Sequence, residues 1–428
     1  MPDSLFTPQE RGTVTGRTTA ASIAGERALA RCLEPFSAED FFGEHWEESP
    51  LVVPRNEPGR FDDLLSLADV ERLVCSTGIR YPSFRLVKEG VKFDVGDYTT
   101  DLPWRPDPLT GTAEVGRVLA EFEAGATIVL QALHHTWQPL AMFCRSLEQL
   151  LEHPVQANAY FTPRDSQGLA VHHDTHDVFV LQIAGEKRWL VYEPVFPLPL
   201  RHQSYRKELG APGAPVHDIL LRPGDTLYMP RGWLHEAATS ATDSLHLTIG
   251  VNVYSWLDAL KAALADCADD VDFRREAPGA IELADELVAR LQDRLAPEEV
   301  ARRRRERFLK GRRQLLDGQL SQLRALDELD ADTLLERRDT VTPHVDVSDD
   351  EVDLSFEAGK IVFPAGVRAE IEFIAEADEP FCPADLPGDL NEESRLVLVR
   401  RLVREGFLLI SGVARDAPSQ RSDGGAAE

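Results

Sequence analysis

Several features that would assign this chain to a familiar class of protein are missing. Its five cysteines are scattered along 428 residues without a CxxC pair, which argues against a zinc ribbon or a disulfide framework. No apolar run reaches the roughly 18 residues that a membrane span needs. The first thirty residues contain charges but lack the apolar core of a secretory signal. We therefore expect a cytoplasmic protein that does not enter a membrane.

Positive charge is also scarce. The chain has 46 Lys and Arg residues against 73 Asp and Glu residues, a net charge of −27. An acidic surface of this kind is repelled by phosphates and attracts basic polypeptides. The one basic cluster, residues 302–313, lies in a helical pattern and is better explained as a solvated helix face paired with acids. The composition argues against direct nucleic-acid binding and favours a basic protein or peptide partner.

The chain also lacks an HExxH motif, a dinuclear-hydrolase HxHxDH motif and a glycine-rich phosphate loop. Its middle instead contains many short apolar runs separated by Gly, Pro and Asp turns. The strands predicted from them are 155–161, 169–174, 177–183, 187–192, 218–221, 225–229, 234–238 and 245–254. Closely spaced short strands predict an antiparallel sandwich or barrel, for which a jelly roll is one solution.

The periodicity changes along the chain and predicts five segments. A short helix capped near Ser37, helices at 66–75, 113–123 and 139–151, and a strand at 126–133 precede the barrel strands. From Trp256 the apolar period changes from two to about 3.6. We expect a disordered N-terminus (1–30), a mainly β catalytic domain (31–255), an all-helical segment suited to dimerisation (256–340), a small α+β winged-helix-like domain (341–413) and a disordered tail (414–428).

His172 and Asp174 are the first candidates for metal ligands. Alternate residues of a strand point to the same side, so the two side chains could bind one ion together. A third ligand would complete the triad of two His and one carboxylate that leaves positions of an Fe(II) ion open. His235, in a Pro-Arg-Gly-Trp turn context, is the best candidate, His246 is the second, and His176 shares the face of His172. A polar surface strand would explain the HxD triplet alone equally well.

Lys187 is the first candidate for binding an organic acid. It follows a turn at Gly185 on a mostly apolar strand, where an unpaired lysine is costly. A dicarboxylate that chelates iron through its keto-acid end needs such a cation for its far carboxylate. Asn158, Tyr160 and Thr248 could complete the pocket, since Asn158 and Tyr160 share a strand face. Each of these residues is common in strands, and only their combination indicates a pocket for an organic acid.

Three stretches together resemble a known family. NAYFTPRDSQGLAVHHDTHDVFVLQIAGEKRW, LRPGDTLYMPRGWLHEA and SLHLTIGV closely resemble the Jumonji-C oxygenases of the ribosomal-oxygenase group, which are Fe(II)- and 2-oxoglutarate-dependent protein hydroxylases with a double-stranded β-helix (cupin) fold. The resemblance covers about residues 33–255. It extends more weakly over the later segments, which look like the family's dimerisation helices and winged-helix domain.

The resemblance implies roles for the candidate residues. His172, Asp174 and His235 match the iron ligands, Lys187 matches the residue that pairs with the distal carboxylate of 2-oxoglutarate, and Asn158, Tyr160 and Thr248 match the co-substrate pocket. The sequence departs from the family's common pattern at three positions without losing a ligand. Val171 replaces a proline, His173 replaces a tyrosine, and Gly250 stands where a small hydroxyl residue is frequent.

The function expected is hydroxylation of a protein side chain, an Arg or His of a ribosomal protein, by a homodimer. Two alternatives stay open within the enzymes: hydroxylation of a small metabolite or peptide natural product, and N-methyl-lysine demethylation. A non-catalytic metal-binding cupin that acts as an interaction protein is the alternative outside the enzymes.

Overall fold

The computed structural model describes residues 20–103, 105–276, 285–357 and 359–413. The described chain divides into two compact units, one holding residues 22–254 and the other residues 255–413. The boundary between them falls next to the predicted end of the catalytic domain. No helix within the described ranges is long and apolar enough to cross a membrane.

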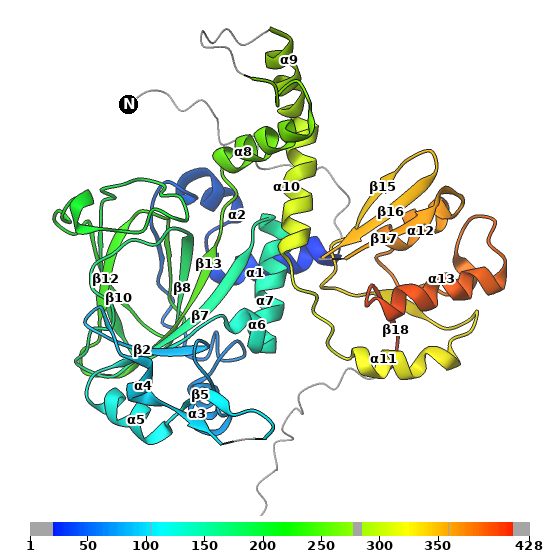
Figure 1. Ribbon diagram of the computed structural model, residues 1–428. Helices are drawn as coiled ribbons and strands as arrows, with labels where there is room; N and C mark the ends of the chain where they lie inside the picture. Colours follow the sequence, from blue (N-terminus) through cyan, green and yellow to red (C-terminus); the bar gives the residue numbers. More distant parts are fainter. Residues whose placement is uncertain (1–19, 104, 277–284, 358, 414–428) are drawn as a thin grey trace, which may run out of the picture. The chain divides into compact units, whose positions relative to one another are not determined.

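The first unit is built on two antiparallel sheets (Figure 1). The larger sheet has the strand order β1-β11-β8-β13-β7-β6-β2-β3, and the smaller has the order β10-β9-β12. Their bounds are β1 Leu51–Val53, β2 Phe84–Lys88, β3 Val91–Lys92, β6 Thr127–Leu130, β7 Val155–Thr162, β8 Asp177–Ala184, β9 Lys187–Tyr192, β10 His217–Leu221, β11 Thr226–Met229, β12 Leu234–Ala238 and β13 Ser244–Val251. This is a double-stranded β-helix, which confirms the predicted fold class.

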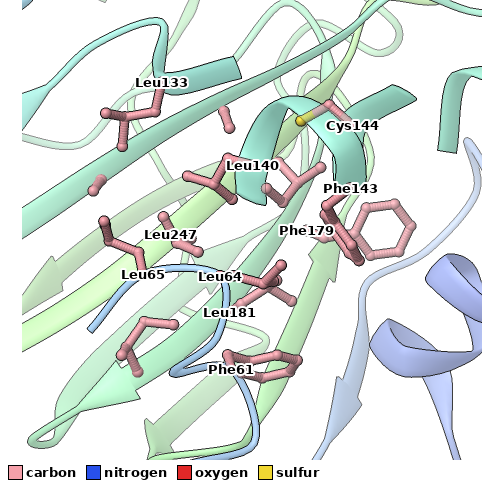
Figure 2. Close-up of a cluster of buried hydrophobic side chains, with 14 of the residues drawn as sticks. Phe61, Leu64, Leu65, Leu133, Leu140, Phe143, Cys144, Phe179, Leu181 and Leu247 are labelled. Atoms are coloured by element: carbon pink, nitrogen blue, oxygen red, sulfur yellow. The ribbon is translucent and has the colours of Figure 1, made fainter. Parts of the chain in front are cut away.

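Alternation along the strands gives the larger sheet two different faces. Its outer face is apolar and packs against helix α7 (Gln138–Leu151), as Figure 2 shows for Phe179, Leu181 and Leu247 beside Leu140 and Phe143. Its inner face turns toward the smaller sheet. Between the sheets lies a separate buried cluster: Val178, Val180, Trp189, Val191, Leu221, Leu227 and Met229. The polar candidates of β7 and β13 also lie on this inner face.

Other elements of the chain up to residue 254 surround the barrel. Two helix starts agree with the sequence signals, because the hydroxyls of Ser37 and Ser66 accept the backbone N–H of the third following residue. These elements are α1 Ala20–Leu33, α2 Ala38–Asp40, the π-helical turn η2 Phe41–His45, α3 Leu67–Ser76, α4 Val95–Tyr98, β4 Thr99–Leu102, β5 Leu109–Ala113, α5 Val115–Glu123, α6 Leu133–Thr136 and η3 Lys207–Leu209.

Two predictions for this part of the chain are wrong. Helix α1 begins at Ala20, within the segment predicted to be disordered. Its Ala-rich sequence has high helix propensity, and its residues Leu29, Cys32 and Leu33 are buried. Residues 169–174 do not form a strand, and their only pairing is an isolated bridge between His172 and His235. The predicted disorder of residues 1–19 and of the tail 414–428 lies outside the described residues.

The second unit begins with helices and ends in a small α+β core. Its elements are α8 Trp256–Asp266, η4 Cys267–Asp269, α9 Asp285–Arg294, α10 Pro297–Gly311, α11 Gln319–Ala325, η5 Leu326–Glu328, β14 Leu335–Arg337, β15 His344–Val347, β16 Glu351–Phe356, β17 Gly359–Pro364, η6 Ala365–Val367, α12 Arg368–Glu376, η7 Pro383–Asp385, α13 Glu392–Arg404 and β18 Leu408–Ile410. Strands β15, β16 and β17 form one sheet, and β14 pairs with β18.

The prediction of an all-helical segment over residues 256–340 is wrong near its end, where β14 is a strand. Helix α10 ends at Gly311, and α11 starts after Gly318, whose φ of 75° interrupts a helix. Leu335 then pairs with Ile410 of the last strand. Because Leu326 and Leu335 are already part of the C-terminal hydrophobic core, that core begins before residue 341. The division of this unit into a helical and a winged-helix-like domain stays a prediction.

Candidate active site

The three predicted metal ligands lie together at one end of the barrel. His172, Asp174 and His235 each offer one ligand atom, and these atoms all lie within 4.8 Å of one another. Asp174 is central: its two carboxylate oxygens lie 4.0 Å from Nε2 of His172 and 3.8 Å from Nε2 of His235. The prediction that these residues meet is thus matched by the geometry, although the HxD triplet lies on a loop.

Backbone hydrogen bonds bring the two histidines together in place of the predicted strand. The backbone N–H of His172 donates to the carbonyl of His235 (3.1 Å), and the reverse bond is 2.8 Å long. Nδ1 of each ring lies against a carbonyl, that of Ala170 for His172 (2.8 Å) and that of Trp233 for His235 (3.0 Å). A ring that donates from Nδ1 keeps the lone pair of Nε2 for a metal ion. Both Nε2 atoms face Asp174.

The electrostatics of the cluster favour the protonation states that bind a cation. Burial lowers the pKa of His235 to about 4, so its imidazole is neutral at physiological pH. Burial alone would raise the pKa of Asp174, but the surrounding imidazoles, with His176 first, outweigh it and lower that pKa. Metal ligation needs neutral imidazole and ionised carboxylate. The cluster therefore has the donor set for a divalent ion such as Fe(II).

The two other histidines considered as ligands lie elsewhere. His246 stacks on Tyr160, with ring centroids 5.0 Å apart and planes 2° apart, and is not in the ligand cluster. His176 lies within hydrogen-bonding distance of Gln156 (3.2 Å). A Cβ added at Gly250 would lie 2.3 Å from Cδ2 of His176. Position 250 is glycine in this chain because the ring of His176 fills the space that a side chain would need.

Lys187 is buried, with 4% of its surface exposed. Its Nζ donates to Oγ1 of Thr162 at 2.9 Å, and it forms no ion pair with an acid of the described chain. Burial therefore lowers the pKa of Lys187 to about 7. Nε1 of Trp189 and Nδ1 of His246 are also buried without a hydrogen-bond partner. Buried polar atoms without a partner, together with a buried lysine that has no acidic partner in the described chain, fit the carboxylate of a bound acid.

The remaining predicted pocket residues follow from strand register. Thr248 pairs with Asn158, and His246 pairs with Tyr160, so all four share the inner face. The amide oxygen of Asn158 accepts the backbone N–H of Ala132 at 3.0 Å, which fixes that side chain. Sequence reasoning missed Thr162, the partner of Lys187. Alternation from Tyr160 could have found it, because it lies two residues further along the same strand.

A buried ion-pair network holds the two segments that carry the ligands. Nη1 of Arg231 lies 2.9 Å from Asp177 and 2.6 Å from Glu47. The backbone N–H of Gly232 donates to the carbonyl of Asp174 at 3.1 Å. Arg231 precedes His235 by four residues, and Asp177 follows Asp174 by three. The network therefore positions two of the three candidate ligands.

Comparisons with known proteins find a family over the part of the chain that holds these residues. Residues 132–259 match the model of the JmjC domain. The chain is 34% identical over 226 residues to the bifunctional lysine-specific demethylase and histidyl-hydroxylase NO66 of Drosophila persimilis, covering 53% of this chain and 31% of that protein. It is 34% identical over 258 residues to ribosomal oxygenase 2 of Rattus norvegicus, covering 58% and 53%. The chain thus spans just under a third of one relative and about half of the other.

Solved structures show the same fold over a longer stretch. The ribosomal oxygenase YcfD of Escherichia coli is 20% identical, with a TM-score of 0.51 over 88% of this chain and 98% of that one. Another YcfD structure, in complex with cobalt and 2-oxoglutarate, is 19% identical with a TM-score of 0.50 over 87% and 98%. Residues 132–259 match the JmjC domain, and the solved structures have the same fold around them. The rat relative is named a ribosomal oxygenase, in agreement with the resemblance drawn from the motifs, and the solved structures agree with the fold.

Proposed function

We propose that this protein is a dioxygenase that uses Fe(II) and 2-oxoglutarate to hydroxylate a protein side chain, an Arg or His of a ribosomal protein. The observation that carries the proposal is the convergence of two imidazoles and one carboxylate within 4.8 Å, in the same barrel as a buried lysine that has no acidic partner among the described residues. Two His and one carboxylate leave positions of the ion open for a co-substrate and O₂. The lysine supplies the cation that a dicarboxylate needs.

The residues of the chain then have distinct tasks. Nε2 of His172, Nε2 of His235 and a carboxylate oxygen of Asp174 hold the ion, and Lys187 and Thr162 hold the far carboxylate of 2-oxoglutarate. Bound together, iron and 2-oxoglutarate supply the oxidising chemistry, in which O₂ is consumed and the co-substrate leaves as succinate and CO₂. The apolar residues between the two sheets exclude water from the buried end of this pocket.

The substrate assignment rests on charge and on the relatives. A chain with a net charge of −27 attracts basic polypeptides such as ribosomal proteins. The relatives are named as ribosomal oxygenases and a histidyl-hydroxylase. The test is succinate formation by the Fe(II)-loaded protein with and without extracted ribosomal proteins. We expect stimulation that disappears in His172→Ala; no stimulation by any polypeptide would contradict the assignment.

N-methyl-lysine demethylation is the second candidate, because the name of the NO66 relatives includes it. Both reactions form succinate, but their products differ in mass. Hydroxylation adds the mass of one oxygen to the substrate, whereas demethylation removes a methylene and releases formaldehyde. Mass spectrometry of ribosomal proteins and methylated peptides after turnover separates the two.

We also propose a homodimer formed through the helices of the second unit. Trp256, Leu260 and Leu264 on helix α8 are 62%, 43% and 56% exposed, and residues four apart lie on one side of a helix. An apolar stripe of this kind is typical of protein–protein interfaces. Light scattering should give the mass of a dimer for the native chain and that of a monomer for a Leu260→Glu, Leu264→Glu variant. A monomeric native chain would exclude the dimer.

A further inference from the structure

Arg85 is a basic residue of the first unit that none of the roles above uses. It lies on β2 opposite Val129 of β6, and Val129 lies opposite Tyr160 of β7. Directly paired residues of an antiparallel sheet point to the same side, so Arg85 shares the inner face with Tyr160. The turn after β2 is attached to the loop before His172, because the N–H of Gly90 donates to the carbonyl of Gly168 at 2.8 Å. Arg85 therefore lies on the Tyr160 side of the candidate site.

No acid balances the charge of Arg85 within the described chain. Its Nε donates to the side-chain oxygen of Gln131, which is a neutral amide. Its Nη1 is buried without a hydrogen-bond partner, and Arg85 forms no ion pair among the described residues. By contrast, Arg231, the buried arginine behind the ligands, is paired with two carboxylates. A structural arginine is normally paired in this way, whereas Arg85 is half-buried and has a buried Nη1 without a partner, which is available to a ligand.

The charge of Arg85 acts on the same space as the metal cluster. Burial and the charge of Asp174 raise the pKa of Tyr160 to about 12, and the charge of Arg85 opposes this rise. The hydroxyl of Tyr160 is therefore within electrostatic range of both Asp174 and Arg85. When a cation occupies the carboxylate of Asp174 and a dicarboxylate occupies Lys187, the charges of those two residues are compensated. The charge of Arg85 remains.

We propose that Arg85 makes the pocket select an uncharged target side chain, so that a neutral imidazole is accepted and a guanidinium or ammonium group is rejected. The inference rests on the proposed function and narrows its target from Arg or His to His. Like charges repel strongly in a site that excludes water, whereas a neutral imidazole nitrogen can accept a hydrogen bond from Nη1. The acidic surface attracts the basic flanks of a substrate, but Arg85 acts on the one side chain that enters the pocket.

The first experiment identifies the target residue. Extracted ribosomal proteins are incubated with the full-length Fe(II)-loaded protein, 2-oxoglutarate and O₂, and each residue that gains an oxygen is identified by mass spectrometry. We expect the gain on histidine. A gain on arginine or lysine would overturn the inference but leave the proposed function intact, whereas no gain on any polypeptide would overturn the proposed function itself.

The second experiment separates the effect of the target side chain's charge from the effect of its shape. Peptides spanning the identified site carry histidine, arginine or citrulline at the target position, since citrulline is an uncharged analogue of arginine with nearly the same shape. Peptide affinity is measured by fluorescence anisotropy with the protein loaded with Mn(II) and 2-oxoglutarate. We expect the native protein to bind the citrulline peptide at least about tenfold more tightly than the arginine peptide, a difference of roughly 1.4 kcal/mol.

Substitutions of Arg85 then show whether its charge is the cause. Arg85→Gln should bring the affinity ratio close to one, and Arg85→Lys, which keeps the charge, should preserve most of the discrimination. Arg117→Gln changes an exposed arginine on α5 and should leave the ratio unchanged. Equal binding of both peptides by the native protein, or an unchanged ratio in Arg85→Gln, would overturn the inference. A purely structural role would change both Arg85 variants alike.

Discussion

The burial of Lys187 makes a quantitative prediction about proton uptake on 2-oxoglutarate binding. With a pKa of about 7, roughly nine-tenths of the free protein has neutral Lys187 at pH 8, and roughly one-tenth at pH 6. The carboxylate of the co-substrate stabilises the charged lysine and raises its pKa. Binding should therefore take up about 0.9 proton at pH 8 and about 0.1 at pH 6.

The same linkage fixes the pH dependence of the affinity. Because the lysine must be protonated before it pairs, the dissociation constant of 2-oxoglutarate should rise about tenfold for each pH unit above 7 and level off below it. Proton uptake is measured by titration calorimetry of the Mn(II)-loaded protein in buffers of different ionisation enthalpy. His246 also responds to the charge of Lys187, but burial holds its pKa well below the usual value, so it stays neutral over this range.

Lys187→Arg is the matched control. A guanidinium stays protonated up to pH values far above this range, so the variant should bind without taking up a proton at either pH, with an affinity that is flat between pH 6 and pH 8. Uptake of less than about 0.2 proton by the native protein at pH 8 would refute the reasoning. Undiminished uptake in Lys187→Arg would assign the proton to another group.

Three further predictions concern stability, measured by urea denaturation. Lys187→Met should raise the free energy of unfolding at pH 7 by at least about 2 kcal/mol, because a pKa lowered from 10.5 to about 7 means that the charged lysine destabilises the fold; the gain should shrink as the pH approaches 10.5. Arg231→Met should cost about 3–5 kcal/mol, because Asp177 and Glu47 lose their buried partner; a smaller loss would show that water replaces it. Gly250→Ala should cost about 1–3 kcal/mol by displacing His176, and His176→Ala in the same chain should recover most of it, which a double-mutant cycle checks.

Much of the barrel could be predicted because its strands are recognisable from local sequence patterns. Period-two alternation and Gly, Pro and Asp turns placed β7, β8, β9 and β12 within one or two residues of their observed bounds. The failures have a different cause. Residues 169–174 have the composition of a strand, but they pair with another segment only through the single bridge between His172 and His235. Pairing is a tertiary property, and composition alone does not determine it.

The candidate site likewise contains residues that could be predicted from local sequence and one residue that could not. The HxD triplet, the lysine after Gly185 and the histidine after a Pro-Arg-Gly turn are recognisable because each is a short motif with its own local context. Arg85 has no such signal. It reaches the inner face only because β2 pairs with β6 and β6 with β7, pairings between segments far apart in the sequence.

This difference bears on how the site chooses its substrate. The proposed metal and co-substrate residues lie on the central strands of the barrel or on the loops that join them. The charge that would discriminate between targets lies on β2, near the edge of the larger sheet in the order β7-β6-β2-β3. A residue this near the edge can change its charge without disturbing the candidate ligands. Substrate preference should therefore depend on the residue at position 85 even when His172, Asp174 and His235 are unchanged. The ratio of the affinities for the citrulline and arginine peptides, measured for the native protein and for Arg85→Gln, tests this dependence.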